Sequence, residues 1–106
     1  METKESKLFH ILDQSTNILA EKLNIPYLEA LIHSAENLID EGKVYNIDNV
    51  LSKNTEKDLK ELYQQVELSD YSAEEIRKSM QLSLLRGMKE DFIQANHQMT
   101  PDSLGN

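Results

Sequence analysis

The chain has 106 residues and a mass of 12.2 kDa, which is the size of a single domain with one modest core. Three glycines and two prolines are too few for the many turns of a β-sandwich or barrel, whereas 39% hydrophobic and 28% charged residues suit a globular helical protein. Nineteen acidic against eleven basic residues give a formal net charge of −8 without a basic cluster, so repulsion from phosphates disfavours direct binding of nucleic acid.

A first helix is predicted over about residues 4–23, where hydrophobic residues return at three- and four-residue steps. Asn24 and Ile25 interrupt it, and Pro26 suits the first position of a second helix because its missing N–H would have no partner there. The second helix is expected over about residues 26–41, with Gly42 as a left-handed C-terminal cap. The expected core stripes are Leu8, Phe9, Ile11, Leu12, Ser15, Ile18, Leu19 and Leu23, and then Leu28, Leu31, Ile32, Ala35, Leu38 and Ile39.

Residues 44–51 are predicted to form a loop, with a strand-like connector or a turn of helix as alternatives. A third helix is expected from about Thr55, which with Asp58 resembles a weak capping box, to about Leu68. Ser72 and Glu75 fit the capping box fully, and a fourth helix should follow them to about residue 92. The core positions expected in these two helices are Leu59, Leu62, Tyr63, Val66, Ile76, Met80, Leu84, Leu85 and Met88.

These elements predict an all-α fold, a compact bundle or orthogonal array of about four helices with an irregular C-terminal tail. The helical domain should cover residues 1–93, and residues 94–106 should be a tail that begins a further, catalytic domain. The chain has no cysteine and no apolar run of membrane-spanning length, so we expect a cytoplasmic protein without membrane contacts.

A complete active site is not expected within these residues. His10, His33 and His97 lack the three- or four-residue spacing that places two metal ligands on one helix face, so no metal site is predicted. The three glycines lie too far apart to form a phosphate-binding loop, and the acidic residues fit solvated helix faces better than a pair of catalytic carboxylates.

A helix-turn-helix is a competing interpretation of residues 18–41, in which the second helix would read DNA. Residues 27–41 contain four acidic residues and neither Lys nor Arg, so this helix would repel the DNA backbone. A helical hairpin packed in the core is the better interpretation. His10 and His33 are then expected at the boundary of that core.

Three segments resemble a known family: residues 73–78 (AEEIRK), residues 84–89 (LLRGMK) and residues 96–102 (NHQMTPD). They are similar to the amino-terminal helical region, and the entry to the catalytic domain, of class I S-adenosylmethionine-dependent methyltransferases of Gram-positive bacteria related to adenine-specific (N6) DNA methylases. Residues 27–37 are similar to the same family, so the resemblance covers most of the chain.

The resemblance implies a cofactor-binding role for the Thr100–Pro101 step, which in these methylases opens the catalytic domain and helps to hold S-adenosylmethionine. Thr100 would cap a helix whose amino terminus suits the carboxylate of the cofactor. The resemblance also places His97 and Gln98 at the border of that pocket. Asn96 and Met99 depart from the family pattern, which usually has a glycine and an aromatic residue there.

The glycine-rich cofactor loop and the Asn/Asp-Pro-Pro-aromatic tetrapeptide of the family do not occur in these 106 residues. The resemblance therefore implies a methyltransferase as the parent protein, while the segment alone is expected neither to bind S-adenosylmethionine nor to transfer a methyl group. Its expected partner is the missing catalytic domain, with a homodimer as a second option and nucleic acid only through the parent protein. The alternative is a free-standing acidic helical module that binds another protein.

Overall fold

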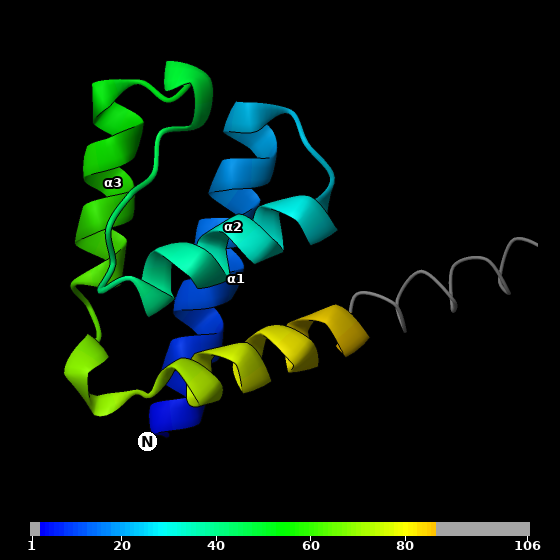
Figure 1. The fold of residues 1–106 in the computed structure, drawn as a ribbon, viewed down its shortest axis with the longest axis vertical. Coiled ribbons are helices and arrows are strands. Elements are labelled where there is room, and N and C mark those ends of the chain that lie inside the picture. Colours follow the sequence, from blue (N-terminus) through cyan, green and yellow to red (C-terminus); the bar gives the residue numbers. More distant parts are fainter. Residues whose placement is uncertain (1–2, 87–106) are drawn as a thin grey trace, which may run out of the picture.

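The computed structural model describes residues 3–86, and within them every regular element is a helix (Figure 1). Helix α1 spans Lys4–Leu23, α2 spans Tyr27–Ile39 and α3 spans Lys53–Tyr63. Two short 3₁₀ turns, Ile47–Asn49 and Leu68–Asp70, lie in the connections, and a last helix runs from residue 73 through residue 86. The predicted all-α fold is confirmed, and the first helix has the predicted bounds.

The turn between α1 and α2 uses the breakers that the sequence indicates, with one difference. Asn24 adopts the left-handed conformation (φ 54°) as the C-cap of α1, and the N–H of Ile25 donates to the carbonyl of Ala20 at 3.1 Å. Pro26 is the N-cap of α2 and not its first helical residue, since its backbone is extended (ψ 153°). Its carbonyl accepts the first helical hydrogen bond, from Ala30 at 3.0 Å.

Helix α2 ends two residues earlier than predicted, and Gly42 forms the expected left-handed turn behind it. Glu41 and Gly42 both have positive φ angles, of 57° and 76°, and the N–H of Gly42 donates to the carbonyl of Asn37 at 2.8 Å. A Cβ at residue 42 would lie 2.8 Å from Cδ1 of Leu68 and 3.2 Å from Cβ of Tyr63. The glycine therefore permits both the turn and the close approach of the chain that follows α3.

The N-cap of α3 differs from the prediction. Ser52 is the cap, because its hydroxyl accepts from the N–H of Thr55 at 3.1 Å, and Thr55 lies inside the helix with a buried side chain. The helix also stops at Tyr63, five residues before the predicted end, in tight turns that still bring Val66 into the core. Periodicity alone could not indicate this end, since Leu62 and Val66 keep helical spacing through the turn.

The capping box of the last helix is confirmed. The N–H of Glu75 donates to the hydroxyl of Ser72, and the N–H of Ser72 donates to the carboxylate of Glu75, both at 3.1 Å. The hydrogen bond from the Ser72 backbone, followed by the charge of Lys4, lowers the pKa of Glu75. Lys4 lies 3.6 Å from this carboxylate, and the hydroxyl of Tyr71 donates to the Lys4 carbonyl at 2.8 Å. These contacts attach the start of the last helix to the start of α1.

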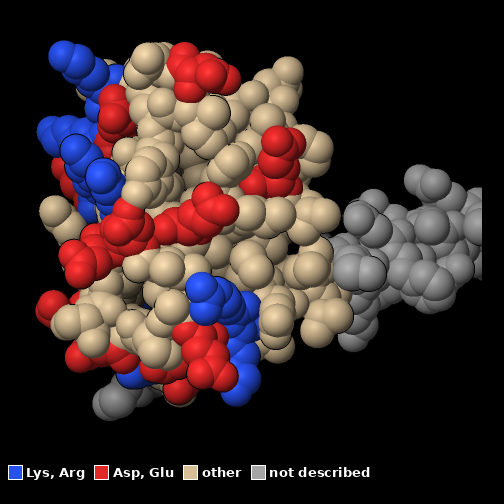
Figure 2. Space-filling view, viewed as in Figure 1, with Lys and Arg blue, Asp and Glu red and all other residues tan. Residues whose placement is uncertain are grey.

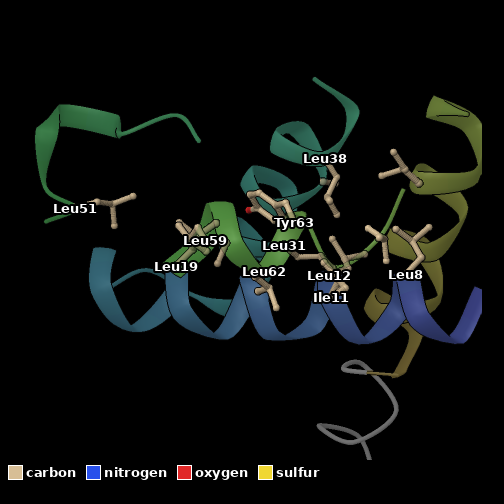
Figure 3. Close-up of a cluster of buried hydrophobic side chains, with 14 residues drawn as sticks. Leu8, Ile11, Leu12, Leu19, Leu31, Leu38, Leu51, Leu59, Leu62 and Tyr63 are labelled. Carbon is tan, nitrogen blue, oxygen red and sulfur yellow. The ribbon is translucent and has the colours of Figure 1, made fainter. Parts of the chain in front are cut away.

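The core lies where α1, α2 and α3 meet, and the last helix contributes Ile76 to it (Figure 3). Tyr63 of α3 lies between the leucines of α1 and α2 in this view. Most predicted core positions are buried or half-buried, but three are wrong: Leu28, Ile32 and Leu85 are exposed. The buried apolar residues are Leu8, Ile11, Leu12, Leu19, Ala30, Leu31, Ala35, Leu38, Leu51, Leu59, Leu62, Tyr63, Val66 and Ile76.

Candidate functional site

The four residues predicted to bind a cofactor, His97, Gln98, Thr100 and Pro101, lie outside the described residues, as do the predicted tail and the end of the fourth helix. The described part holds three features that bear on function: a buried polar cluster, a cavity beside α1, and exposed leucines on the last helix.

The buried polar cluster joins the three core helices through the hydroxyl of Tyr63. This oxygen lies 2.5 Å from the hydroxyl of Ser15 in α1 and accepts a hydrogen bond from the amide of Asn37 in α2 at 3.1 Å. The amide oxygen of Asn37 in turn accepts from the N–H of Tyr45 at 3.4 Å. The sequence analysis placed Ser15 and Tyr63 in the core but did not predict that Asn37 is buried. The sequence gives one indication of this burial, because Asn37 lies three residues after Ser34 and therefore on the same face of α2.

The cluster is unsuited to catalysis. Burial raises the pKa of Tyr63, against the smaller opposing effect of its hydrogen bonds to Ser15 and Asn37, so the phenol stays neutral at physiological pH. A nucleophile would need an adjacent base, and neither Ser15 nor Asn37 can act as one. We therefore interpret the cluster as a structural device that fixes how α1, α2 and α3 pack.

A cavity of about 270 Å³ lies between the first half of α1 and the last helix. Leu8 and Phe9 form one wall, and Ser79 and Leu82 form the other. Charged side chains line it as well, contributed by Glu5, Glu75 and Lys78. Ser79 is 7% exposed, and its hydroxyl has no hydrogen-bond partner among the described residues.

Two leucines on the last helix, which we call the leucine patch, are the most exposed large apolar side chains of residues 3–86. Leu82 is 59% exposed and Leu85 is 61% exposed, and their three-residue spacing places them on one face of the helix. Leu82 also lines the cavity. In Figure 2, most of the visible charged atoms lie on the left and toward the bottom. Arg86, at the end of the described part of the last helix, is exposed, and its guanidinium lies 5.6 Å from the centre of the Phe9 ring.

The outer face of α2 does not have the chemistry of a DNA-reading helix. It exposes Leu28 and Ile32 together with the carboxylates of Glu29 and Glu36. No side chain in this helix offers a cation to a phosphate or a guanidinium to a guanine. α2 instead packs against α1 and supplies Leu31 and Leu38 to the core, as expected for a helical hairpin.

The structure describes His10 in α1 and His33 in α2. His33 is half-buried, as expected at the edge of the core, whereas His10 is exposed. Among residues 3–86, no group of three or more His, Asp and Glu side chains is arranged to hold a metal ion. Within the same range, none of the helices combines the length and the apolar character needed to cross a bilayer.

Comparisons with known proteins identify relatives over almost the whole chain. The sequence model of a family described as the YtxK N-terminal helical domain matches residues 6–88. The uncharacterised protein YtxK of Bacillus subtilis is 34% identical over 98 residues, which cover 92% of this chain and 29% of that protein. A crystal structure from Listeria monocytogenes, provisionally described as a class I S-adenosylmethionine-dependent methyltransferase, is 45% identical with a TM-score of 0.60, covering 95% of this chain and 29% of that one. The chain thus spans less than a third of the length of both relatives.

Proposed function

This chain belongs to the family of YtxK N-terminal helical domains, and from this membership we propose that it is the amino-terminal helical domain of a class I S-adenosylmethionine-dependent methyltransferase. The observation that carries the proposal is the similarity to the Listeria structure, which combines 45% identity with a TM-score of 0.60 over 95% of this chain. In this proposal the domain fills the place of a non-catalytic module, and the catalytic residues belong to another part of the parent protein.

We propose that residues 3–86 do not bind S-adenosylmethionine by themselves. The amino terminus of the last helix, which could accept the cofactor carboxylate, is already occupied by the Ser72 and Glu75 side chains of its own capping box. The cavity beside α1 has apolar walls, and its charged lining includes two glutamates that would repel that carboxylate. The proposal therefore assigns the cofactor to the catalytic part of the parent protein. Thr100 and Pro101, with His97 and Gln98 before them, would stand at the entry to that part.

The proposed acceptor of the methyl group is adenine in DNA, which rests on the similarity of residues 96–102 to the entry of N6-adenine methylases. The helical domain itself would not touch the nucleic acid, since its net charge and the carboxylates on α2 repel phosphates. Its proposed roles are packing on the catalytic part, dimerisation or positioning of the substrate.

Transfer of a tritiated methyl group from S-adenosylmethionine tests the proposed activity in the full-length parent protein. Unmethylated DNA, RNA and a protein mixture would be offered separately, and the product nucleosides identified. We expect label in N6-methyladenine of DNA. Label in RNA or protein would contradict adenine in DNA as the acceptor but would support methyltransferase activity. No transfer to any acceptor would contradict both the acceptor and the activity.

A free-standing acidic interaction module is the second candidate, and the exposed Leu28 and Ile32 on α2 favour it, since exposed apolar side chains suit a partner helix. The mass of the natural gene product separates the two candidates. A product several times heavier than 12.2 kDa that contains a glycine-rich turn and a Pro-Pro tetrapeptide supports the methyltransferase. A product of about this mass that copurifies with a helical partner supports the interaction module.

A further inference from the structure

We infer that the leucine patch and the adjoining cavity form the surface on which the covalently linked catalytic part docks. This inference rests on the proposed function, because it takes the following region of the parent protein as the partner. Leu82, Leu85 and the cavity would then hold the helical domain and the catalytic part together.

The position of the patch in the family domain is the first argument. The match to the family ends at residue 88, and the family is described as an N-terminal domain, so the remaining length of a family member follows directly after it. Leu82 and Leu85 lie six and three residues before that boundary. Among the exposed large apolar residues of residues 3–86, these two leucines are the nearest in sequence to that boundary.

The character of the surface is the second argument. The chain is strongly acidic, yet the two most exposed large apolar side chains of residues 3–86 lie together on one face of the last helix. Beside it lies the cavity of about 270 Å³, with Leu8 and Phe9 on its far wall. The buried hydroxyl of Ser79, which lines this cavity, has no partner among residues 3–86 and could donate to a carbonyl of the docked region.

The size of the surface favours a linked partner over a second copy of the chain. Two leucines and one small cavity are far less than the roughly 800 Å² per partner that stable association of separate proteins needs. A region attached a few residues away has an effective concentration in the millimolar range, so a small apolar contact is enough to hold it. The expected contribution from the catalytic part is therefore one or two apolar side chains, of which one enters the cavity.

Thiol labelling of the full-length protein tests this inference. The 106 residues contain no cysteine, so Leu82→Cys and Leu85→Cys each introduce one labelled site that peptide mass spectrometry can follow. Val50→Cys is the matched control, because Val50 is 57% exposed and lies in the connection before α3, away from the last helix. Substitutions at these exposed sites should leave the fold intact, which circular dichroism would verify.

The inference predicts that the thiols at positions 82 and 85 react at least about tenfold more slowly than the thiol at position 50, in a protein that light scattering shows to be monomeric. Reaction at rates within about twofold of the control would overturn it, since the patch would then be free. Protection that disappears on dilution as a dimer dissociates would also overturn it, in favour of a second copy. Failure of S-adenosylmethionine binding in the same protein would refute the proposed function instead, and the labelling rates would still report whether the surface is covered.

Discussion

At the scale of single residues, Tyr63 has the largest structural role. It is 2% exposed, and its hydroxyl is the point where hydrogen bonds from α1 and α2 meet. The spacing of apolar residues predicted that Tyr63 is buried, because that spacing reports which face of a helix is covered. It could not predict Asn37 as a partner, since a polar residue at a stripe position is recognised only when the opposing helix is known.

Replacing Tyr63 with phenylalanine should destabilise the chain by about 1–3 kcal/mol, because the buried hydroxyl of Ser15 and the amide of Asn37 would lose their shared partner. Urea unfolding measures this. Tyr45→Phe is the matched control, since Tyr45 is exposed and its hydroxyl donates to Asp40 at the surface, so its cost should stay within about 0.5 kcal/mol. Equal costs for the two variants would contradict a structural role of the cluster.

The raised pKa of Tyr63 also predicts a pH dependence. In the unfolded chain the phenol ionises near pH 10, whereas burial keeps it protonated to higher pH in the folded chain. The unfolded state therefore binds fewer protons than the native state above that pH, and the free energy of unfolding should fall as pH rises from about 10 toward the raised pKa. This decline should be smaller in Tyr63→Phe. Parallel curves for the two proteins would show that Tyr63 ionises normally.

Gly42 is the residue whose replacement the backbone tolerates least. Gly42→Ala should cost about 1–3 kcal/mol, because the added Cβ would sit at a positive φ and 2.8 Å from Cδ1 of Leu68. The neighbouring Glu41→Gly should leave stability unchanged within about 1 kcal/mol or raise it, since Glu41 already has a positive φ. Thermal unfolding of both variants is the measurement. A Gly42→Ala protein as stable as the original would mean that the turn can relax.

At the scale of elements, the sequence predicted the four helices well but their ends less well. The start of the last helix was predictable because Ser72 and Glu75 carry a specific pattern that the structure confirms. The start of α3 was predicted at Thr55 instead of Ser52, since both are hydroxyl residues and only the backbone shows which one caps. The exposure of Leu82 and Leu85 on the last helix could not be predicted from the sequence. Apolar residues at helical spacing can line either the core of this domain or a surface that another domain covers.

The capping box gives the element-scale prediction. Ser72→Ala should lower the free energy of unfolding by about 1 kcal/mol, since the N–H of Glu75 would lose its hydrogen-bond acceptor, the Ser72 hydroxyl. Ser69→Ala, in the 3₁₀ turn just before, should change stability by less than about 0.5 kcal/mol because Ser69 is exposed. Urea unfolding with both variants checks the contrast. A Ser69 variant as destabilised as the Ser72 variant would point to general disturbance of the connection instead of a lost cap.

At the scale of the whole molecule, the described helices form a domain that occurs in longer proteins. The family is described as an N-terminal domain, and the chain covers 29% of YtxK and 29% of the Listeria protein. The cofactor residues predicted from the sequence all follow residue 86 and lie outside the described residues. Contact of the leucine patch with another part of the protein is our proposal, which thiol labelling at positions 82 and 85 tests.

We propose that this domain belongs to a protein that binds S-adenosylmethionine through residues outside the domain. Isothermal calorimetry with S-adenosylmethionine, on the full-length parent protein and on the 106-residue chain separately, is the decisive measurement. We expect saturable heat with about one site for the full-length protein and no measurable heat for the chain alone. Saturable heat from the chain alone, or none from the full-length protein, would contradict it.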